Sequence, residues 1–240
     1  MNNKYFANLH YENINFKQRK SKWIKLLDGL FYTFLVVIAC YLIFSYIFIQ
    51  AYVIGPSMQP TFNKNLTYID DPETSQYQDI VYVNRFDGGN NGDVILAKAN
   101  GDVVIKRIIA TENQMVVLKK LDDGYFYYFV GDDYESVHAL DESYILSRAD
   151  MNINYFNRFC LENPELENRK NVNVVKSGEE AYIIVPKGCV FILGDNRGIS
   201  SDSLLFGCID TDNVIGSVAF SYEYNQTFLG YIWQQICSIF

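Results

Sequence analysis

The chain has 240 residues, of which 49% are apolar and 20% are charged, and this composition is sufficient for one folded domain with a hydrophobic core. It excludes a wholly disordered chain. The formal net charge of -8 argues against broad nucleic-acid binding, because a protein that neutralises phosphates carries an excess of Lys and Arg. The charge is uneven, because the first 28 residues contain six basic and two acidic side chains.

An uncharged apolar segment follows this basic region. It runs from Gly29 to Ile49, and the next charged residue is Lys64. A bilayer core requires about 20 apolar residues in a helix, so we predict a transmembrane helix at 29–50 behind a cytoplasmic basic tail at 1–28. A buried core helix and a cleaved signal peptide are the alternatives, but the run is long for both. The positive-inside rule places the N-terminus in the cytoplasm and the rest of the chain outside.

Beyond the predicted span, short runs of β-branched and aromatic residues alternate with turn sequences. They lie at 79–84, 93–98, 102–110, 115–121 and 125–130, with DGGNNG, NG and DDG turns between some of them. Strand-like sequence returns in AYIIV, CVFILGD and VIGSVAF. We therefore predict a mainly β fold, with an extracytoplasmic antiparallel core formed by 51–130 and 181–225. An acidic, Asn-rich region at 131–180 is predicted to be an inserted cap.

The C-terminal segment at 226–240 is also apolar. It is interrupted by Gln234 and Gln235 and is short for a second span. We expect it to pack on the core or to lie at the membrane surface.

Cysteine and histidine are too sparse to suggest a metal site, and we expect neither a metal nor a cofactor. The five cysteines are widely spaced and match neither a zinc site nor a disulfide scaffold. Cys160 could pair with Cys189 or Cys208, although the apolar sequence around these two favours buried free thiols. His138 is the one histidine on the predicted exported side, so a hydrolase built on this chain would need another base.

The segment GPSMQPT at Gly55–Thr61 is a turn with two prolines, a few residues beyond the predicted span. Such a rigid turn can direct the Ser57 hydroxyl and the Ser57 backbone N–H toward one point, which would provide a nucleophile and an oxyanion donor. A plain polar turn leaving a membrane helix is the simpler interpretation of this segment taken alone.

A candidate base is Lys106, in the run VVIKRII. Strand alternation places Lys106 on the same face as Val104 and Ile108. Desolvation on an apolar face lowers the pKa of a lysine, which would let Lys106 accept a proton from serine. The alternative is that Lys106 extends along a strand edge to water while Arg107 faces solvent.

A third feature is the polar loop GDNRGISSDS at 194–203, which follows the apolar run CVFIL. Ser200 or Asp202 could orient the Lys106 ammonium, as a third group orients the base in a catalytic triad. A calcium-binding loop or a plain turn is the alternative, although the oxygen ligands lack EF-hand spacing.

Taken together, these segments resemble the type I (leader) signal peptidases, which are membrane-anchored serine proteases with a Ser-Lys dyad. The resemblance implies that Ser57 is the nucleophile and Lys106 the general base. Ser200 would hold the lysine, and Asp202 and Arg197 would support the same loop. The matching segments keep the family's order behind the anchor: PSMQPT at 56–61, GDVIL at 92–96, VIKRII at 104–109 and FILGDNRGISSDSLLFG at 191–207.

Three positions depart from the family pattern. Gly55 stands where some members have a hydroxyl that contributes to the oxyanion hole. ATENQ at 110–114 replaces a Gly-x-Pro-Gly-Asp turn, and Leu204 replaces an Arg. These departures affect loops, and both positions of the dyad are filled.

The resemblance also implies an activity, which is removal of signal peptides from exported preproteins after small-x-small sites such as Ala-x-Ala. An extended substrate would pair with chain edges near 51–56 and 104–106. The alternative is a non-catalytic homologue that binds exported chains in surface or pilus assembly. We expect short apolar pockets lined by Val53, Ile54, Gly55, Met58 and Ile105.

The expected partners are therefore signal peptides and membrane lipid, with no nucleic acid. The expected location is a bacterial plasma membrane, crossed once, with the catalytic domain outside. There the protein would act as a monomer alongside the secretion machinery.

Overall fold

The computed structural model describes residues 22–64, 79–145, 147–148, 175–177, 180–223 and 227–237. Residues 1–21 of the basic tail predicted at 1–28, Cys160 and much of the predicted insertion lie outside these residues. The chain divides into two compact units, one ending at Tyr46 and the other beginning at Ile47.

The first unit is an apolar helix, α1 (Lys22–Ile47). Its segment Trp23–Ile47 is long and apolar enough to cross a membrane, and most of its large side chains are exposed. The predicted end of the span at residue 50 is wrong, because Phe48–Tyr52 form a strand, β1. Hydropathy does not distinguish an apolar helix from the apolar strand that follows it, and Phe48, Ile49 and Tyr52 are residue types common in strands.

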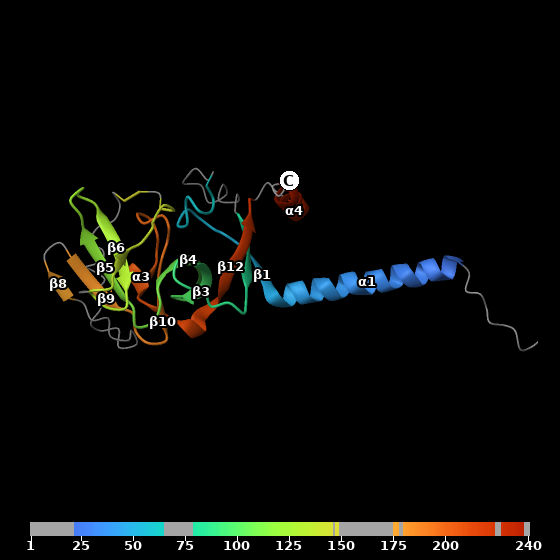
Figure 1. The fold of residues 1–240 in the computed structure, drawn as a ribbon, viewed down its shortest axis with the longest axis horizontal. Helices are drawn as coiled ribbons and strands as arrows, with labels where there is room; N and C mark the ends of the chain where they lie inside the picture. Colours follow the sequence, from blue (N-terminus) through green and yellow to red (C-terminus); the bar gives the residue numbers. More distant parts are fainter. Residues whose placement is uncertain are drawn as a thin grey trace, which may run out of the picture. The chain divides into compact units, whose positions relative to one another are not determined.

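The second unit contains an antiparallel sheet of seven strands (Figure 1). Its order is β1-β2-β12-β3-β4-β10-β11, so the C-terminal strand β12 lies between β2 and β3. The strands other than β1 are β2 (Ile80–Asn84), β3 (Val94–Ala99), β4 (Asp102–Ala110), β10 (Cys189–Leu193), β11 (Ile209–Asp210) and β12 (Val214–Tyr222).

A second antiparallel sheet has five strands in the order β7-β6-β5-β9-β8. The two sheets confirm the predicted mainly β class. The region predicted as a cap contributes to this sheet, because β7 and β8 come from it and residue 131 ends β6. The strands are β5 (Met115–Lys120), β6 (Phe126–Gly131), β7 (His138–Ala139), β8 (Val175–Ser177) and β9 (Glu180–Ile184).

Strand β10 lies at the centre of the core. Cys189, Phe191 and Leu193 pack into a cluster shared with β5, β6 and β9, whereas Val190 and Ile192 pack into a second cluster with β3 and β4. Alternate side chains of a strand point to opposite faces, so β10 is buried on both faces and is apolar throughout. Cys189 is buried in this core, and its thiol donates to Asp210 Oδ1 at 3.4 Å.

The C-terminal segment forms a short helix, α4 (Phe228–Cys237). The Phe228 ring lies 6.4 Å from that of Phe220 and 6.3 Å from that of Tyr222, both on β12. Tyr231 stacks on Phe220 at 6.1 Å. The described part of this segment therefore packs on the sheet, as one of the two expectations had it, while Leu229 remains 77% exposed.

Candidate functional site

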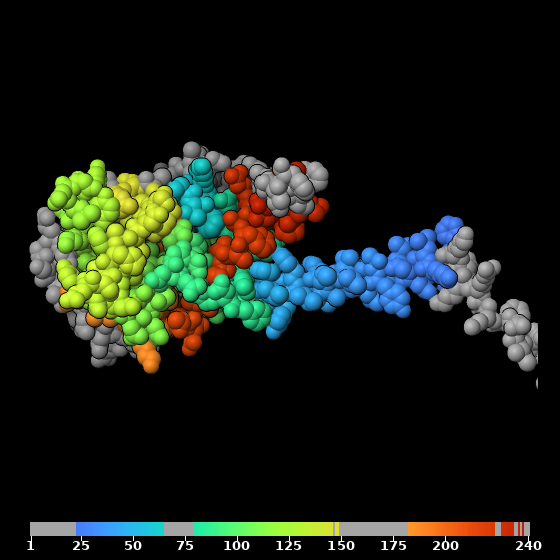
Figure 2. Space-filling model, viewed as in Figure 1, coloured from blue at the N-terminus to red at the C-terminus, as the bar shows by residue number. Residues whose placement is uncertain are grey.

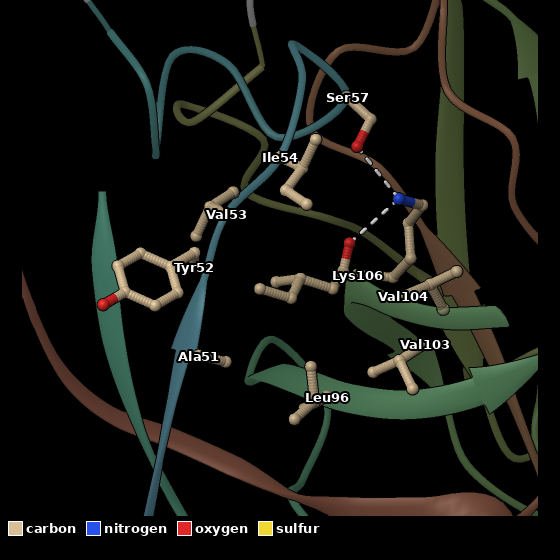
Figure 3. A pocket seen from close by; sticks show the side chains of 10 residues that line it. Ala51, Tyr52, Val53, Ile54, Ser57, Leu96, Val103, Val104 and Lys106 are labelled. Atoms are coloured by element: carbon tan, nitrogen blue, oxygen red, sulfur yellow. Dashed lines mark hydrogen bonds between the residues drawn. The ribbon is translucent and has the colours of Figure 1, made fainter. Parts of the chain in front are cut away.

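Ser57 and Lys106 meet at the surface of the seven-stranded sheet. Ser57 lies in the turn after β1, and Lys106 lies in the middle of β4. Lys106 Nζ donates to Ser57 Oγ at 3.0 Å and to the Ile105 carbonyl oxygen at 2.9 Å (Figure 3). Lys106 is 4% exposed, so it does not extend to water as the alternative required.

The turn that carries Ser57 is held by Asn63, a buried residue that the sequence analysis did not identify. Asn63 Nδ2 donates to the carbonyl oxygens of Val53 at 2.7 Å and Gly55 at 2.9 Å. Asn63 and Asp79 also exchange two bonds between backbone N–H and side chain, each 2.8 Å long. Gly55 has φ 79°, a left-handed conformation that favours glycine, and this explains why a side chain is absent here.

The environment of Lys106 favours the neutral amine. Burial is the largest influence and lowers the pKa of Lys106 below its ordinary value. The carboxylates of Asp202 and Asp195 act in the opposite direction without cancelling this effect. A lysine with a lowered pKa next to a serine hydroxyl is suited to accept its proton.

The loop that follows β10 holds the Ser57 turn from the other side. Asn196 donates its backbone N–H to the Ser57 carbonyl oxygen at 3.0 Å and its side-chain amide to that of Pro56 at 3.2 Å. A Cβ added to Gly194 would lie 2.5 Å from Ser200 Cβ and 2.6 Å from the Ser57 carbonyl oxygen. Only glycine fits between the loop and the turn at position 194.

Asp202 organises the end of this loop and does not contact Lys106 directly. Its carboxylate accepts from the backbone N–H of Gly194 at 3.0 Å and of Leu204 at 3.1 Å, the latter as the N-cap of α3 (Ser203–Phe206). Burial raises the pKa of the Asp202 carboxyl, and these two N–H groups, Ser200 and Lys106 oppose the rise.

The expectation that Ser200 holds the lysine differs from this geometry. Ser200 Oγ is buried and makes no well-aligned hydrogen bond within the described residues. The second acceptor for Lys106 Nζ is the Ile105 carbonyl oxygen instead. Ser200 acts instead on the Asp202 carboxyl, whose pKa it helps to lower.

A buried ion pair connects β4, the Ser57 turn and the loop. Arg107 donates to both carboxylate oxygens of Asp195, at 2.8 and 2.6 Å, and the Thr61 hydroxyl donates to the same carboxylate. The Arg107 side chain is 12% exposed and that of Asp195 is fully buried. From the sequence, Arg107 was only a solvent-facing neighbour of Lys106, because strand alternation does not reveal a partner from a distant loop.

Arg197 contacts both this loop and a partner that sequence reasoning missed. Arg197 Nε donates to the Gly194 carbonyl oxygen at 3.0 Å, and Arg197 Nη1 lies 2.6 Å from Glu142 Oε1. Glu142 belongs to the region predicted as a cap, where no motif indicated a role.

A pocket of about 300 Å³ opens beside Ser57 and Lys106 (Figure 3). Val53, Ile54 and Ile105 line it, as expected for substrate contacts. Gly55 and Met58 are not in the lining, and Met58 is 1% exposed because it packs in a core cluster with Phe62 and Val81. The other lining residues are Ala51, Tyr52, Leu96, Val103 and Val104.

One wall of the pocket has an unpaired strand edge. Strand β10 pairs with β4 only from Arg107 to Ala110. All of β3 pairs with β4, along residues 102–107 of β4. Within the described residues, the edge of β4 at Val103–Lys106 that faces away from β3 therefore has no neighbouring strand. The extended segment Ala51–Ile54 forms another wall of the pocket.

Comparison with known proteins agrees with the sequence resemblance. The model of the family described as signal peptidase, peptidase S26, matches residues 23–223. Signal peptidase IB of Staphylococcus aureus strain N315 is 49% identical over 39 residues, which are 16% of this chain and only 20% of that protein. The inactive signal peptidase IA of Staphylococcus aureus strain Mu50 is 25% identical over 186 residues, covering 73% of this chain and 83% of that protein.

A crystal structure of a signal peptidase I from Enterococcus faecalis V583 is also similar, with 24% sequence identity and a TM-score of 0.32. The match covers 55% of this chain and 97% of that one.

The family match extends from α1 to the end of β12 and includes Ser57, Lys106 and the loop after β10. One family model therefore covers the apolar helix and both β sheets. The chain belongs to the signal peptidase family, peptidase S26.

Proposed function

We propose that this chain is an active signal peptidase I, a membrane-anchored serine endopeptidase with Ser57 as nucleophile and Lys106 as general base. The observation that carries this proposal is the 3.0 Å distance between Ser57 Oγ and the Nζ of a lysine that is 4% exposed. A nucleophile and its base normally lie about 2.6–3.2 Å apart.

In the first step, the neutral Lys106 amine accepts the Ser57 hydroxyl proton while Ser57 Oγ attacks the scissile carbonyl carbon. The Ser57 backbone N–H has no acceptor within the described residues, so it is available to stabilise the oxyanion. The Lys106 ammonium then protonates the leaving amine, and the C–N bond breaks to leave an acyl ester on Ser57.

In the second step, Lys106 accepts a proton from a water molecule that attacks the ester carbonyl. The second tetrahedral intermediate expels Ser57 Oγ, which recovers its proton from the Lys106 ammonium. The carboxylic acid product leaves, and the Ser57 hydroxyl and the neutral Lys106 amine are restored.

The pocket suits an extended peptide with small side chains. The unpaired edge at Val103–Lys106 can form backbone hydrogen bonds with a substrate strand, as in β-strand addition. Val53, Ile54 and Ile105 narrow the pocket with apolar side chains. Such a site would accept a small-x-small sequence such as Ala-x-Ala in an exported preprotein.

The membrane setting follows from α1 and the family. We propose a bacterial plasma membrane crossed once by α1, with the N-terminus in the cytoplasm and the catalytic unit outside. The catalytic unit would act as a monomer on signal peptides delivered by the secretion machinery.

A second candidate function is non-catalytic binding of exported chains. The observation that favours it is the relative named inactive signal peptidase IA, which covers 73% of this chain. A homologue without activity shows that membership of the family does not by itself establish cleavage.

The test is cleavage of a synthetic preprotein with an Ala-x-Ala site by the detergent-solubilised full chain, across pH 6 to about 10. Ser57→Ala and Lys106→Met should abolish cutting after the alanine. The rate of the wild type should rise with pH until Lys106 is neutral, and this rise should occur below the pH expected of an ordinary lysine. Lys98→Met, which alters an exposed lysine of the neighbouring β3, is the matched control.

Binding of the preprotein without cleavage by the wild type would favour the second candidate. Cleavage that survives Lys106→Met would show that another group is the base.

A further inference from the structure

The region between β6 and β9 contains a buried carboxylate that the proposed reaction does not use. Glu142 is 3% exposed, and its two oxygens pair with two arginines. Oε1 lies 2.6 Å from Arg197 Nη1, and Oε2 accepts from Arg148 Nη1 at 2.8 Å. A carboxylate buried between two cations holds both of them in fixed positions.

Arg197 connects this carboxylate to the loop beside Ser57. Its side chain is 3% exposed, and its Nε donates to the Gly194 carbonyl oxygen at 3.0 Å. Burial alone would lower the pKa of Arg197, but Glu142, Tyr128 and Tyr144 reverse the effect and raise it. The guanidinium therefore remains charged and depends on Glu142 for compensation.

Gly194 connects Arg197 to the Ser57 turn. Its N–H donates to Asp202 at 3.0 Å, and its Cα lies so close to Ser200 and the Ser57 carbonyl oxygen that no side chain would fit. A displacement of Gly194 would change the position of the Ser57 backbone. The next residue but one, Asn196, is bonded to the same Ser57 carbonyl oxygen.

The same region contacts the second support of the loop. The Tyr144 ring lies 4.0 Å from Arg107 Cζ, so this segment covers the Arg107–Asp195 pair as well. The Leu140 N–H donates to the Tyr128 carbonyl oxygen of β6 at 2.9 Å, which attaches the segment to the second sheet. Figure 2 shows it in yellow on the surface, beside the yellow-green strands β5 and β6.

We propose that Glu142 is a positioning residue for the reaction at Ser57, and that it acts by holding Arg197 against the Gly194 carbonyl oxygen. This inference rests on the proposed peptidase function. Without the Glu142 carboxylate, Arg197 is a buried cation with lost compensation, and it moves to a better-solvated position. Gly194 then loses its constraint, and Ser57 Oγ and Lys106 Nζ lose their alignment.

The kinetic test is Glu142→Gln in the detergent-solubilised full chain. We expect kcat for the synthetic preprotein to fall about 30- to 100-fold, as for other small misplacements of catalytic groups. KM should stay within about threefold, because the pocket lining does not include Glu142. Glu135→Gln, an exposed glutamate of the same region, should change neither parameter.

A double-variant cycle tests the route through Arg197. If Glu142 acts only by holding Arg197, Glu142→Gln should cost little further kcat once Arg197 is already Met. The expected difference between Arg197→Met and the double variant is less than about threefold. If the kcat losses of the two single variants multiply in the double variant, the two residues act independently, and the proposed route through Arg197 is overturned.

Hydrogen exchange provides a readout that does not need activity. In Glu142→Gln, amides of 194–204 should exchange at least about tenfold faster, while those of β3 and the first half of β4 should not change. If the wild type does not cleave, the proposed function fails, but this measurement still tests the positioning role. Equal acceleration of amide exchange throughout the sheet, or no acceleration at 194–204, would overturn the positioning role of Glu142.

Discussion

Strands β4 and β5 carry nearly the same local sequence with opposite results. In β4 the run is Val-Val-Ile-Lys-Arg, and its Lys106 is buried against Ser57. In β5 the run is Val-Val-Leu-Lys-Lys, and its Lys119 is exposed. The alternation of apolar and basic residues therefore does not determine whether a lysine is desolvated.

The neighbours of each strand make the difference. Lys119 lies opposite Tyr127 of β6 and Glu180 of β9, so its strand is paired on both sides. Lys106 lies opposite Ile95 of β3, while β10 pairs with β4 only from Arg107 onward. The Ser57 turn approaches the remaining part of β4, and the lysine is buried under it. A distant turn and a short partner strand thus produce the basic group.

The largest expected effect concerns these two lysines. Lys106→Met should lower kcat/KM for the synthetic preprotein by at least about 10⁴-fold, because it removes the general base. Lys119→Met should stay within about twofold of the wild type. Initial rates of both variants at pH 8 make the measurement, and a comparable loss in Lys119→Met would contradict the distinction between the two strands.

Substitution of the residue after each lysine, Arg107 in β4 and Lys120 in β5, should change the free energy of unfolding by different amounts. Arg107→Met leaves the Asp195 carboxylate buried without its bidentate partner, so we expect a loss of about 3 kcal/mol in the free energy of unfolding. Lys120→Met should cost less, about 1 kcal/mol, because Lys120 is half-buried and not fully desolvated. Urea titrations followed by circular dichroism compare the two, and equal values would show that the Asp195 pair is not stabilising.

A third prediction compares a glycine in tight contact with its neighbours and a glycine that faces open space. Gly194→Ala places a Cβ 2.6 Å from the Ser57 carbonyl oxygen, so the loop or the turn must shift, and activity should fall about 10²-fold. Gly88→Ala adds a Cβ with nothing within 4 Å and serves as the control. Full activity in Gly194→Ala would mean that the loop moves without affecting Ser57.

The smallest expected effect is that of Lys106→Met on stability. This substitution should stabilise the fold, although it should abolish activity. The pKa of Lys106 is lowered in the folded state, so the buried ammonium destabilises the fold most strongly below this folded pKa. The penalty fades as the pH rises to the ordinary lysine value of 10.5. Lys106→Met should therefore stabilise the protein by about 1 kcal/mol at neutral pH, and less at pH 10.

Unfolding experiments at both pH values make this measurement, with Lys119→Met as the reference. A variant that is less stable than the wild type at neutral pH would show that the hydrogen bonds of Lys106 outweigh its desolvation.

Much of the β core could be predicted from local sequence. The run predicted at 102–110 is β4 with the same bounds, and the runs at 79–84 and 93–98 match β2 and β3 to within a residue at each end. Hydrophobic alternation and turn residues are local signals, so they locate these strands well. The first strand was missed because its apolar residues continue those of the preceding helix.

The supports of the site could not be predicted in the same way. Asn63, Arg107 and Glu142 each have a partner in another segment, and nothing near them in the sequence indicates burial. Met58 was predicted to line the pocket, but it is buried in the core instead. Such facts depend on long-range pairing, which a local pattern does not contain.

The central position of β12 has a consequence for how the protein is made. During synthesis β2 and β3 emerge long before Val214–Tyr222, and they expose facing edges until that strand enters between them. The sheet that carries Lys106 is therefore completed only after residue 222 has been synthesised. We expect a nascent or truncated chain ending before residue 214 to be unable to assemble the site, so the order of synthesis itself delays its appearance.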